Sequence, residues 1–124
     1  MLKVVFHIGP NAYSVDASKI AEIVPLLPVK KTDGSADYFA GLLDYRGVSV
    51  PVIDLSLLIT GQPAAARFST RIMILNVQAK KRQELLGLIA ERITTMTHNQ
   101  TAAPPDLETI VPESMYDFLL SSAS

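Results

Sequence analysis

Turn-forming residues interrupt the apolar runs of this chain about every ten residues, and this spacing restricts the fold more than any other feature. The breaks stand at Gly9-Pro10-Asn11, at Asp33-Gly34, at Arg46-Gly47 and at Gly61. The runs between them are short and rich in β-branched and aromatic residues, which favour strands. The chain has no sustained helical period and no internal repeat. The sequence therefore predicts an all-β fold, either one barrel or a pair of barrels.

The central stretch "GVSVPVIDL", residues 47–55, shows the alternation of a strand most clearly. Its valines fall on one face, and the residues between them fall on the other. Because Pro51 cannot donate a hydrogen bond to a neighbouring strand, we expect a strand edge or a bulge there. Asp54 is well placed to cap a helical turn at residues 55–60, and Gly61 is well placed to end it.

The remaining segments read as hairpins and connections. The expected strands are 2–8 with 12–16, 17–24 with one irregular turn, 38–45 with 47–55, and 70–77 with 84–93. A surface loop is expected at 25–37, where two prolines and an Asp-Gly pair occur. The last pair of strands forms a long hairpin with a basic tip. After it, only "ESMYDFLL", residues 113–120, could form a helix.

Composition limits the class of protein and its partners. The 124 residues, 48% apolar and 19% charged, suffice for one folded domain or for two very small subdomains sharing a core. A net charge of -1 provides no general attraction to nucleic acid or to an anionic bilayer. Cysteine is absent, which fits a reducing compartment. The first apolar run is too short for a signal peptide or a membrane span. We therefore expect a cytoplasmic protein without direct membrane insertion.

No arrangement of residues in the sequence announces catalysis. His7 and His98 are the only imidazoles, and their separation matches no metal-ligand spacing. A surface or hydrogen-bonded histidine is the better interpretation of each than a catalytic base. The glycines form no phosphate-binding motif. The basic cluster "AKKRQ" lacks interleaved aromatic residues, so it favours a solvated hairpin tip over a nucleic-acid contact. We expect no enzyme activity, no metal and no cofactor.

Arg46 is the remaining residue of interest, because it lies beside Gly47 between two apolar runs. It could be a solubilising residue at a turn in which Gly47 takes a left-handed conformation. It could equally present a planar, permanently charged guanidinium to a carboxylate or an amide on a partner. The residue pattern alone leaves both interpretations open.

The stretch "YFAGLLDYRGVSVPVIDL" closely resembles the central signature of the CheW-like family of bacterial chemotaxis coupling proteins. "FHIGPNAYSVDASKIAEIVPLLPV" is similar to the opening of that family, and "TRIMILNV" with "LLGLIAERI" is similar to its paired strands. The resemblance covers residues 3 to 97. It implies two small five-stranded, SH3-like β-barrels packed around a shared core. It also implies a non-enzymatic protein of two-component signalling that couples methyl-accepting chemoreceptors to a histidine kinase.

The resemblance also implies which residues bind. Arg46 matches the turn arginine associated with the receptor-binding groove, and Ile20 and Glu22 match a Val-x-Glu segment lining the same region. Apolar positions would supply buried area, while the charged pair would fix the register of a helical receptor hairpin. Contacts with the kinase regulatory domain fall on apolar loops in this family. The apolar segments 25–29 and 52–59 alone suggest that surface here, so the kinase-binding residues are unknown.

The chain departs from the family pattern in two places. "DYRG" replaces Asn-Leu-Arg-Gly, so Asp44 could hold the guanidinium of Arg46 or compete with a receptor carboxylate. "ESMYDFLLSSAS" replaces the usual closing segment, which suggests an incomplete C-terminal barrel with an open strand edge. We therefore predict a homodimer or a strand-exchanged oligomer, or else a degenerate barrel specialised for another system.

Two alternatives to a chemotaxis adaptor remain. The same fold would serve a CheW-like adaptor of a non-motility pathway, such as surface sensing or pilus control, or a divergent protein-binding β-barrel. An enzyme is the more distant alternative, and it would require His7 or His98 to meet two carboxylates in a pocket.

Overall fold

The computed structural model describes residues 2–31, 35–65, 69–79, 81–97 and 104–121. In this part of the chain, strands dominate and the helices are short. The strands are β1 (Leu2–Ile8), β2 (Asn11–Asp16), β3 (Ile20–Pro25), β4 (Phe39–Tyr45), β5 (Val48–Asp54), β6 (Thr70–Ala79) and β7 (Arg82–Thr97). The helices are α1 (Leu55–Thr60), α2 (Tyr116–Ser121) and the 3-10 turns η1 (Ala17–Lys19), η2 (Leu107–Thr109) and η3 (Glu113–Met115). The predicted all-β class is confirmed.

Five strands form a closed ring of pairings. β4 pairs with β5, β5 runs parallel to β7, β7 pairs with β6, and β6 pairs with β3. The chain beyond β3 then returns to β4, where Lys30 and Leu42 exchange backbone hydrogen bonds of 3.0 and 2.9 Å. The ring encloses an apolar cluster centred on Val50, Val52 and Ile72. This ring corresponds to one of the two expected barrels.

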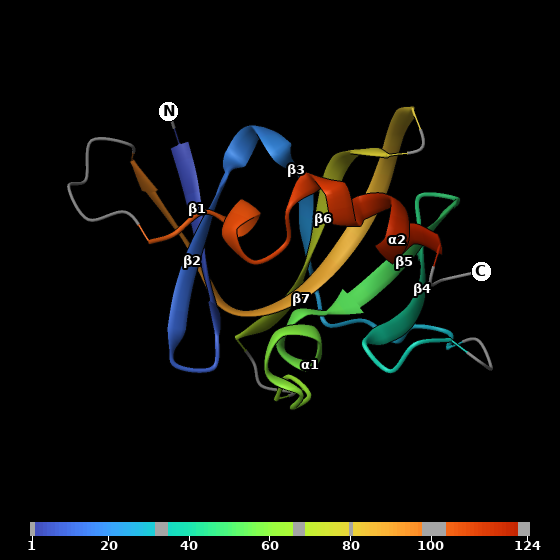
Figure 1. Ribbon diagram of the computed structural model, residues 1–124, viewed down its shortest axis with the longest axis horizontal. Coiled ribbons are helices and arrows are strands. Elements are labelled where there is room, and N and C mark those ends of the chain that lie inside the picture. The colour runs from blue at the N-terminus through green and yellow to red at the C-terminus, as the bar shows by residue number, and fades with distance from the viewer. Residues whose placement is uncertain (1, 32–34, 66–68, 80, 98–103, 122–124) are drawn as a thin grey trace.

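The second half is built on the far part of β7, which continues past Glu91 to pair with β1, and on β2 beyond it. The C-terminal segment, residues 104–121, crosses this half, and its helix α2 contacts β6 (Figure 1). It meets β2 where the backbone N–H of Ser14 donates to the carbonyl of Pro105 at 2.8 Å. Leu107, Val111 and Leu119 enter the core of this half. After β7, the last strand that the structure describes, the turns η2 and η3 and the helix α2 thus complete the core of this half.

β6 and β7 form the wall between the two cores. Along β6, Ile72 and Ile74 face the core of the ring, whereas Met73 and Leu75 face the other core. This arrangement explains why both strands are apolar on nearly both faces, since each face is buried. The expected shared core thus consists of two apolar clusters, which lie on opposite faces of β6 and β7 and share those two strands.

Most of the predicted elements are confirmed, with changes at their ends. Asp54 accepts a hydrogen bond from the N–H of Leu57 at 3.2 Å and so caps α1, which Gly61 ends in a left-handed conformation. Pro51 lies just before the parallel pairing of β5 with β7 begins. β7 extends well beyond the predicted strand 84–93, because it pairs with β6 and then with β1.

Some predictions fall on residues outside the described ranges, or stay open. His98 and the Asp33-Gly34 turn lie outside the described residues. The basic tip is described only in part. The predicted homodimer or strand-exchanged oligomer, and the division into two subdomains, remain predictions.

Candidate functional site

The turn between β4 and β5 places Arg46 at the end of a tight hairpin. Arg46 has φ 52° and Gly47 has φ 82°, so both residues are left-handed. Two such residues form the tight turn whose twist matches that of the flanking strands. Asp44 supports the turn, because its Oδ1 accepts from the backbone N–H of Gly47 at 3.2 Å. The left-handed Gly47 expected from sequence is confirmed, and Arg46 shares that conformation.

Three side chains form a polar cluster beside this turn, which we call the Arg46 cluster: Glu22, Tyr45 and Arg46. The Nη2 of Arg46 donates to the Oε1 of Glu22 at 2.9 Å. The hydroxyl of Tyr45 donates to the same oxygen at 2.7 Å. The guanidinium carbon of Arg46 lies 5.2 Å from the centroid of the Tyr45 ring, within the range of a cation–π interaction. The turn is thereby tied to β3.

The cluster is open to solvent. The side chain of Arg46 is 76% exposed and that of Glu22 is 38% exposed. Exposed ion pairs contribute about 0 to 1 kcal/mol to stability, because water and salt screen them. The Arg46 cluster is therefore a weak source of folding energy, and its polar atoms remain accessible to a partner.

The hydrogen bond to Glu22 also changes the acidity of Tyr45. Donation to the carboxylate is the main cause that raises the pKa of the phenol above its ordinary 10.0, with partial desolvation adding to it and the charge of Arg46 opposing it. The hydroxyl therefore remains a donor throughout the neutral pH range.

The structure brings two of the three predicted binding residues together. Glu22 and Arg46 are in direct contact, although they are 24 positions apart in the chain. Ile20 pairs with Leu75 of β6 and packs against the core of the other half. The pairing register of β3 shifts between Ile20 and Glu22. Because such a bulge reorients the side chains on either side of it, Ile20 packs toward the core of the other half while Glu22 contacts Tyr45 and Arg46.

Sequence reasoning missed Tyr45. Of the two roles considered for Asp44, that of holding the guanidinium of Arg46 is taken by Glu22, and Asp44 bonds to the turn backbone. The available signal was the aromatic residue directly before the arginine, where the family pattern has leucine. Its contact with Glu22 depends on how the hairpin lies over β3, which no local pattern reveals.

Of the two histidines considered as catalytic bases, the structure describes His7. The Nδ1 of His7 lies 3.3 Å from the carbonyl oxygen of Arg92, as expected of a hydrogen-bonded surface histidine. Within the described ranges, no three histidine, aspartate or glutamate side chains gather as metal ligands. The helices described there are also too short to cross a membrane.

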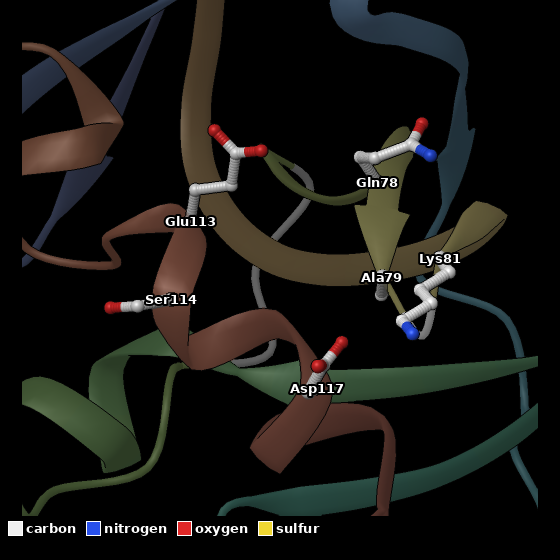
Figure 2. Close-up of a pocket in the computed structure, with 6 residues that line it drawn as sticks. All are labelled: Gln78, Ala79, Lys81, Glu113, Ser114 and Asp117. Atoms are coloured by element: carbon white, nitrogen blue, oxygen red, sulfur yellow. The ribbon is translucent and has the colours of Figure 1, made fainter.

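A cleft of about 380 Å³ lies between the β6–β7 hairpin and the η3–α2 segment. Figure 2 shows Lys81 and Gln78 on one side of it and Glu113, Ser114 and Asp117 on the other. It shares no residue with the Arg46 cluster. Its charged side chains are exposed, which is typical of a solvated surface.

The sequence of this chain is similar to those of known proteins. Residues 3–112 match the family model described as CheW-like domain. The chemotaxis protein CheW of Klebsiella aerogenes is 26% identical over 105 residues, covering 82% of this chain and 61% of that protein. The probable chemotaxis protein CheW of Rhizobium etli is 25% identical over 91 residues, covering 73% of this chain and 56% of that protein. The chain thus spans about three fifths of the length of these relatives.

The solved structures include a similar fold. The scaffolding protein TtCheW from Thermoanaerobacter tengcongensis matches with a TM-score of 0.67 and 22% sequence identity. The match covers 86% of this chain and 66% of that chain. At this identity the likeness establishes a shared fold.

Proposed function

Because this chain belongs to the CheW-like domain family, we propose that it is a non-enzymatic adaptor that couples chemoreceptors to a sensor histidine kinase. It acts at the cytoplasmic tips of the receptors, and its partners are those tips and the regulatory domain of the kinase. The observation that carries the proposal is the family match over residues 3–112, which includes every residue of the Arg46 cluster.

The receptor-binding residues of this proposal are Ile20, Glu22 and Arg46. The geometry supports the role of the last two, because Glu22 and Arg46 form one exposed pair at the end of a hairpin. A side chain that is already ordered loses less conformational entropy when a partner binds. Ile20 contributes through its partly buried apolar surface at the start of β3. The kinase-binding residues stay unassigned.

A pull-down from extract of the source organism tests the proposal, with Arg46→Glu and Arg82→Glu run beside the wild-type chain. Arg82 is a matched control, because its side chain is 74% exposed and also forms an ion pair with a glutamate, Glu84. We expect the wild type and Arg82→Glu to retain both a histidine kinase and chemoreceptors. Arg46→Glu should keep the kinase and lose the receptors.

Two results would contradict the proposal. Recovery of neither partner class by the wild type would reject the adaptor function. Retention of receptors by Arg46→Glu, or their equal loss in both variants, would reject Arg46 as the receptor contact, since the reversed charge would then have no effect or no site specificity.

A further inference from the structure

Tyr45 gives the Glu22–Arg46 pair a fixed arrangement. Its hydroxyl and the Nη2 of Arg46 converge on one oxygen, Oε1 of Glu22, at 2.7 and 2.9 Å. The aromatic ring of Tyr45 lies against the guanidinium of Arg46. The same side chain packs against the core enclosed by the five paired strands, which anchors the phenol. A leucine, as in the family pattern, could supply neither the hydrogen bond nor the cation–π contact. This chain therefore holds the Glu22–Arg46 pair with two contacts, a hydrogen bond and a cation–π contact, that the leucine of the family pattern could not make.

The fixed pair presents a donor and an acceptor together. Both internal hydrogen bonds use Oε1 of Glu22, so Oε2 takes part in neither. A guanidinium has five N–H groups, and this ion pair uses those of one nitrogen. The pair thus retains the remaining donors of Arg46, whose side chain is largely exposed, and a second acceptor oxygen on the partly exposed Glu22.

The charge of the pair is balanced, because Glu22 offsets Arg46. Asp44, whose carboxylate accepts from the turn backbone, adds a further negative charge beside the pair. A partner carboxylate would gain little net attraction here, because Glu22 repels it. A partner cation would be repelled by the guanidinium and could accept no hydrogen bond from it. A neutral group with its own donor and acceptor avoids both conflicts.

We propose that Tyr45 positions the Glu22–Arg46 pair to recognise a side-chain carboxamide, an asparagine or a glutamine, on the partner protein. The carboxamide oxygen accepts from Arg46, and its NH2 group donates to Oε2 of Glu22. Among neutral side chains, only Asn and Gln combine an acceptor oxygen and an NH2 donor in one planar group. This inference rests on the proposed docking role of the same residues and specifies what they recognise.

The experiment measures binding of the full chain to the purified cytoplasmic tip hairpin of a chemoreceptor from the source organism, by calorimetry at low and high salt. Glu22→Gln is the decisive variant. Its Oε1 can still accept from Tyr45 and Arg46, but an NH2 group then replaces Oε2 and meets the NH2 of the partner. We expect binding about 5- to 20-fold weaker, as for loss of a hydrogen bond that leaves a donor unpaired. The wild-type affinity should change little with salt.

A partner carboxylate would give the opposite result. Glu22→Gln would then remove a competing charge and strengthen binding, and the wild-type affinity would fall steeply with salt. Either observation would overturn the proposal. A wild-type chain that fails to bind any receptor tip would instead reject the adaptor function, and the partner-free measurement below would still decide the role of Tyr45.

That measurement follows the Nε–H signal of Arg46 by NMR in the free protein. We expect the side chain to be ordered in the wild type, less ordered in Tyr45→Phe, which keeps the ring, and least ordered in Tyr45→Leu. Tyr13→Phe is the control, because the ring of Tyr13 stacks on Phe6 in the other half of the molecule. Unchanged order of Arg46 in both Tyr45 variants would show that Tyr45 does not position it.

Discussion

Arg46 occupies a conformation that is unfavourable for its residue type. A left-handed φ of 52° costs a residue with a Cβ about 1 to 2 kcal/mol. The exposed ion pair with Glu22 returns about 0 to 1 kcal/mol. Folding stability therefore does not explain an arginine at this position. Such strain supports the proposed role of Arg46 in binding.

The first prediction separates stability from binding at this residue. Arg46→Asn should stabilise the protein by about 0.5 to 1 kcal/mol, because Asn-Gly is the preferred pair for this turn. The same variant should lose receptor binding. Urea unfolding and the pull-down measure the two effects. Arg82→Asn, where φ is not positive, should show no gain; a comparable gain there would indicate a general surface effect.

The second prediction concerns the titration of Tyr45. Its phenol should ionise above the ordinary 10.0, because the neutral hydroxyl donates to Glu22. A pKa raised on folding means that this bond stabilises the protein fully below pH 10 and that the contribution is lost as pH rises through the folded pKa. Ultraviolet titration of the wild type minus Tyr45→Phe isolates this group from Tyr116, whose pKa is raised to about 12 by burial. An ordinary value for Tyr45 would mean that the hydrogen bond is absent in solution.

At the scale of elements, the ring of five strands closes where the chain after β3 meets β4, and this closure depends on a glycine in β4. Gly41 has φ 149°, and a Cβ there would lie 2.8 Å from Cγ2 of Val29 and 2.9 Å from the backbone carbon of Lys30. The chain after β3 can therefore lie against β4 only because this residue has no side chain. The Lys30–Leu42 bridge closes the ring at the same place.

The third prediction follows from this contact. Gly41→Ala should destabilise the protein by about 1 to 3 kcal/mol through overpacking, and the backbone strain adds to that cost. Gly9→Ala is the control, because Gly9 is also left-handed, at φ 58°, but a Cβ there would meet nothing within 4 Å. Urea unfolding compares the two. Equal losses would mean that backbone conformation, and not ring closure, sets the cost.

Local signals predicted most of the elements, but not how they pair. The period-two valines of β5, the Asp54 cap and the Gly61 stop are encoded within a few residues, and the structure confirms them. The length of β7 depends on two successive partners, β6 and β1, which lie far away in the chain. The contact between Glu22 and Tyr45 is non-local in the same way. Resemblance to a family identified Glu22 and Arg46, whereas Tyr45 departs from the family pattern and became visible only in the structure.

At the scale of the whole molecule, the two cores depend on each other. β6 and β7 separate them, and each strand contributes alternate residues to both. The C-terminal segment, residues 104–121, completes one core. It also reaches the start of β4, where the ring centroids of Phe118 and Tyr38, the residue before that strand, lie 6.4 Å apart. The loss of either core therefore exposes one face of β6 and β7, the two strands that both cores share.

The fourth prediction tests this dependence through Leu119, which is fully buried at the C-terminal end of the described chain. Leu119→Ala should destabilise the protein by about 2 to 5 kcal/mol, because it leaves a cavity in the core. Its neighbour Phe118 is 60% exposed, so Phe118→Ala should cost about 1 kcal/mol or less.

Because both halves share β6 and β7, Leu119→Ala should lower the unfolding midpoint of both halves together. Far-ultraviolet circular dichroism and NMR signals of Val50 in the ring core and Phe6 in the other core should then report one transition. If Val50 kept its wild-type midpoint while Phe6 lost it, the two halves would be independent subdomains, and the C-terminal segment would support only its own half.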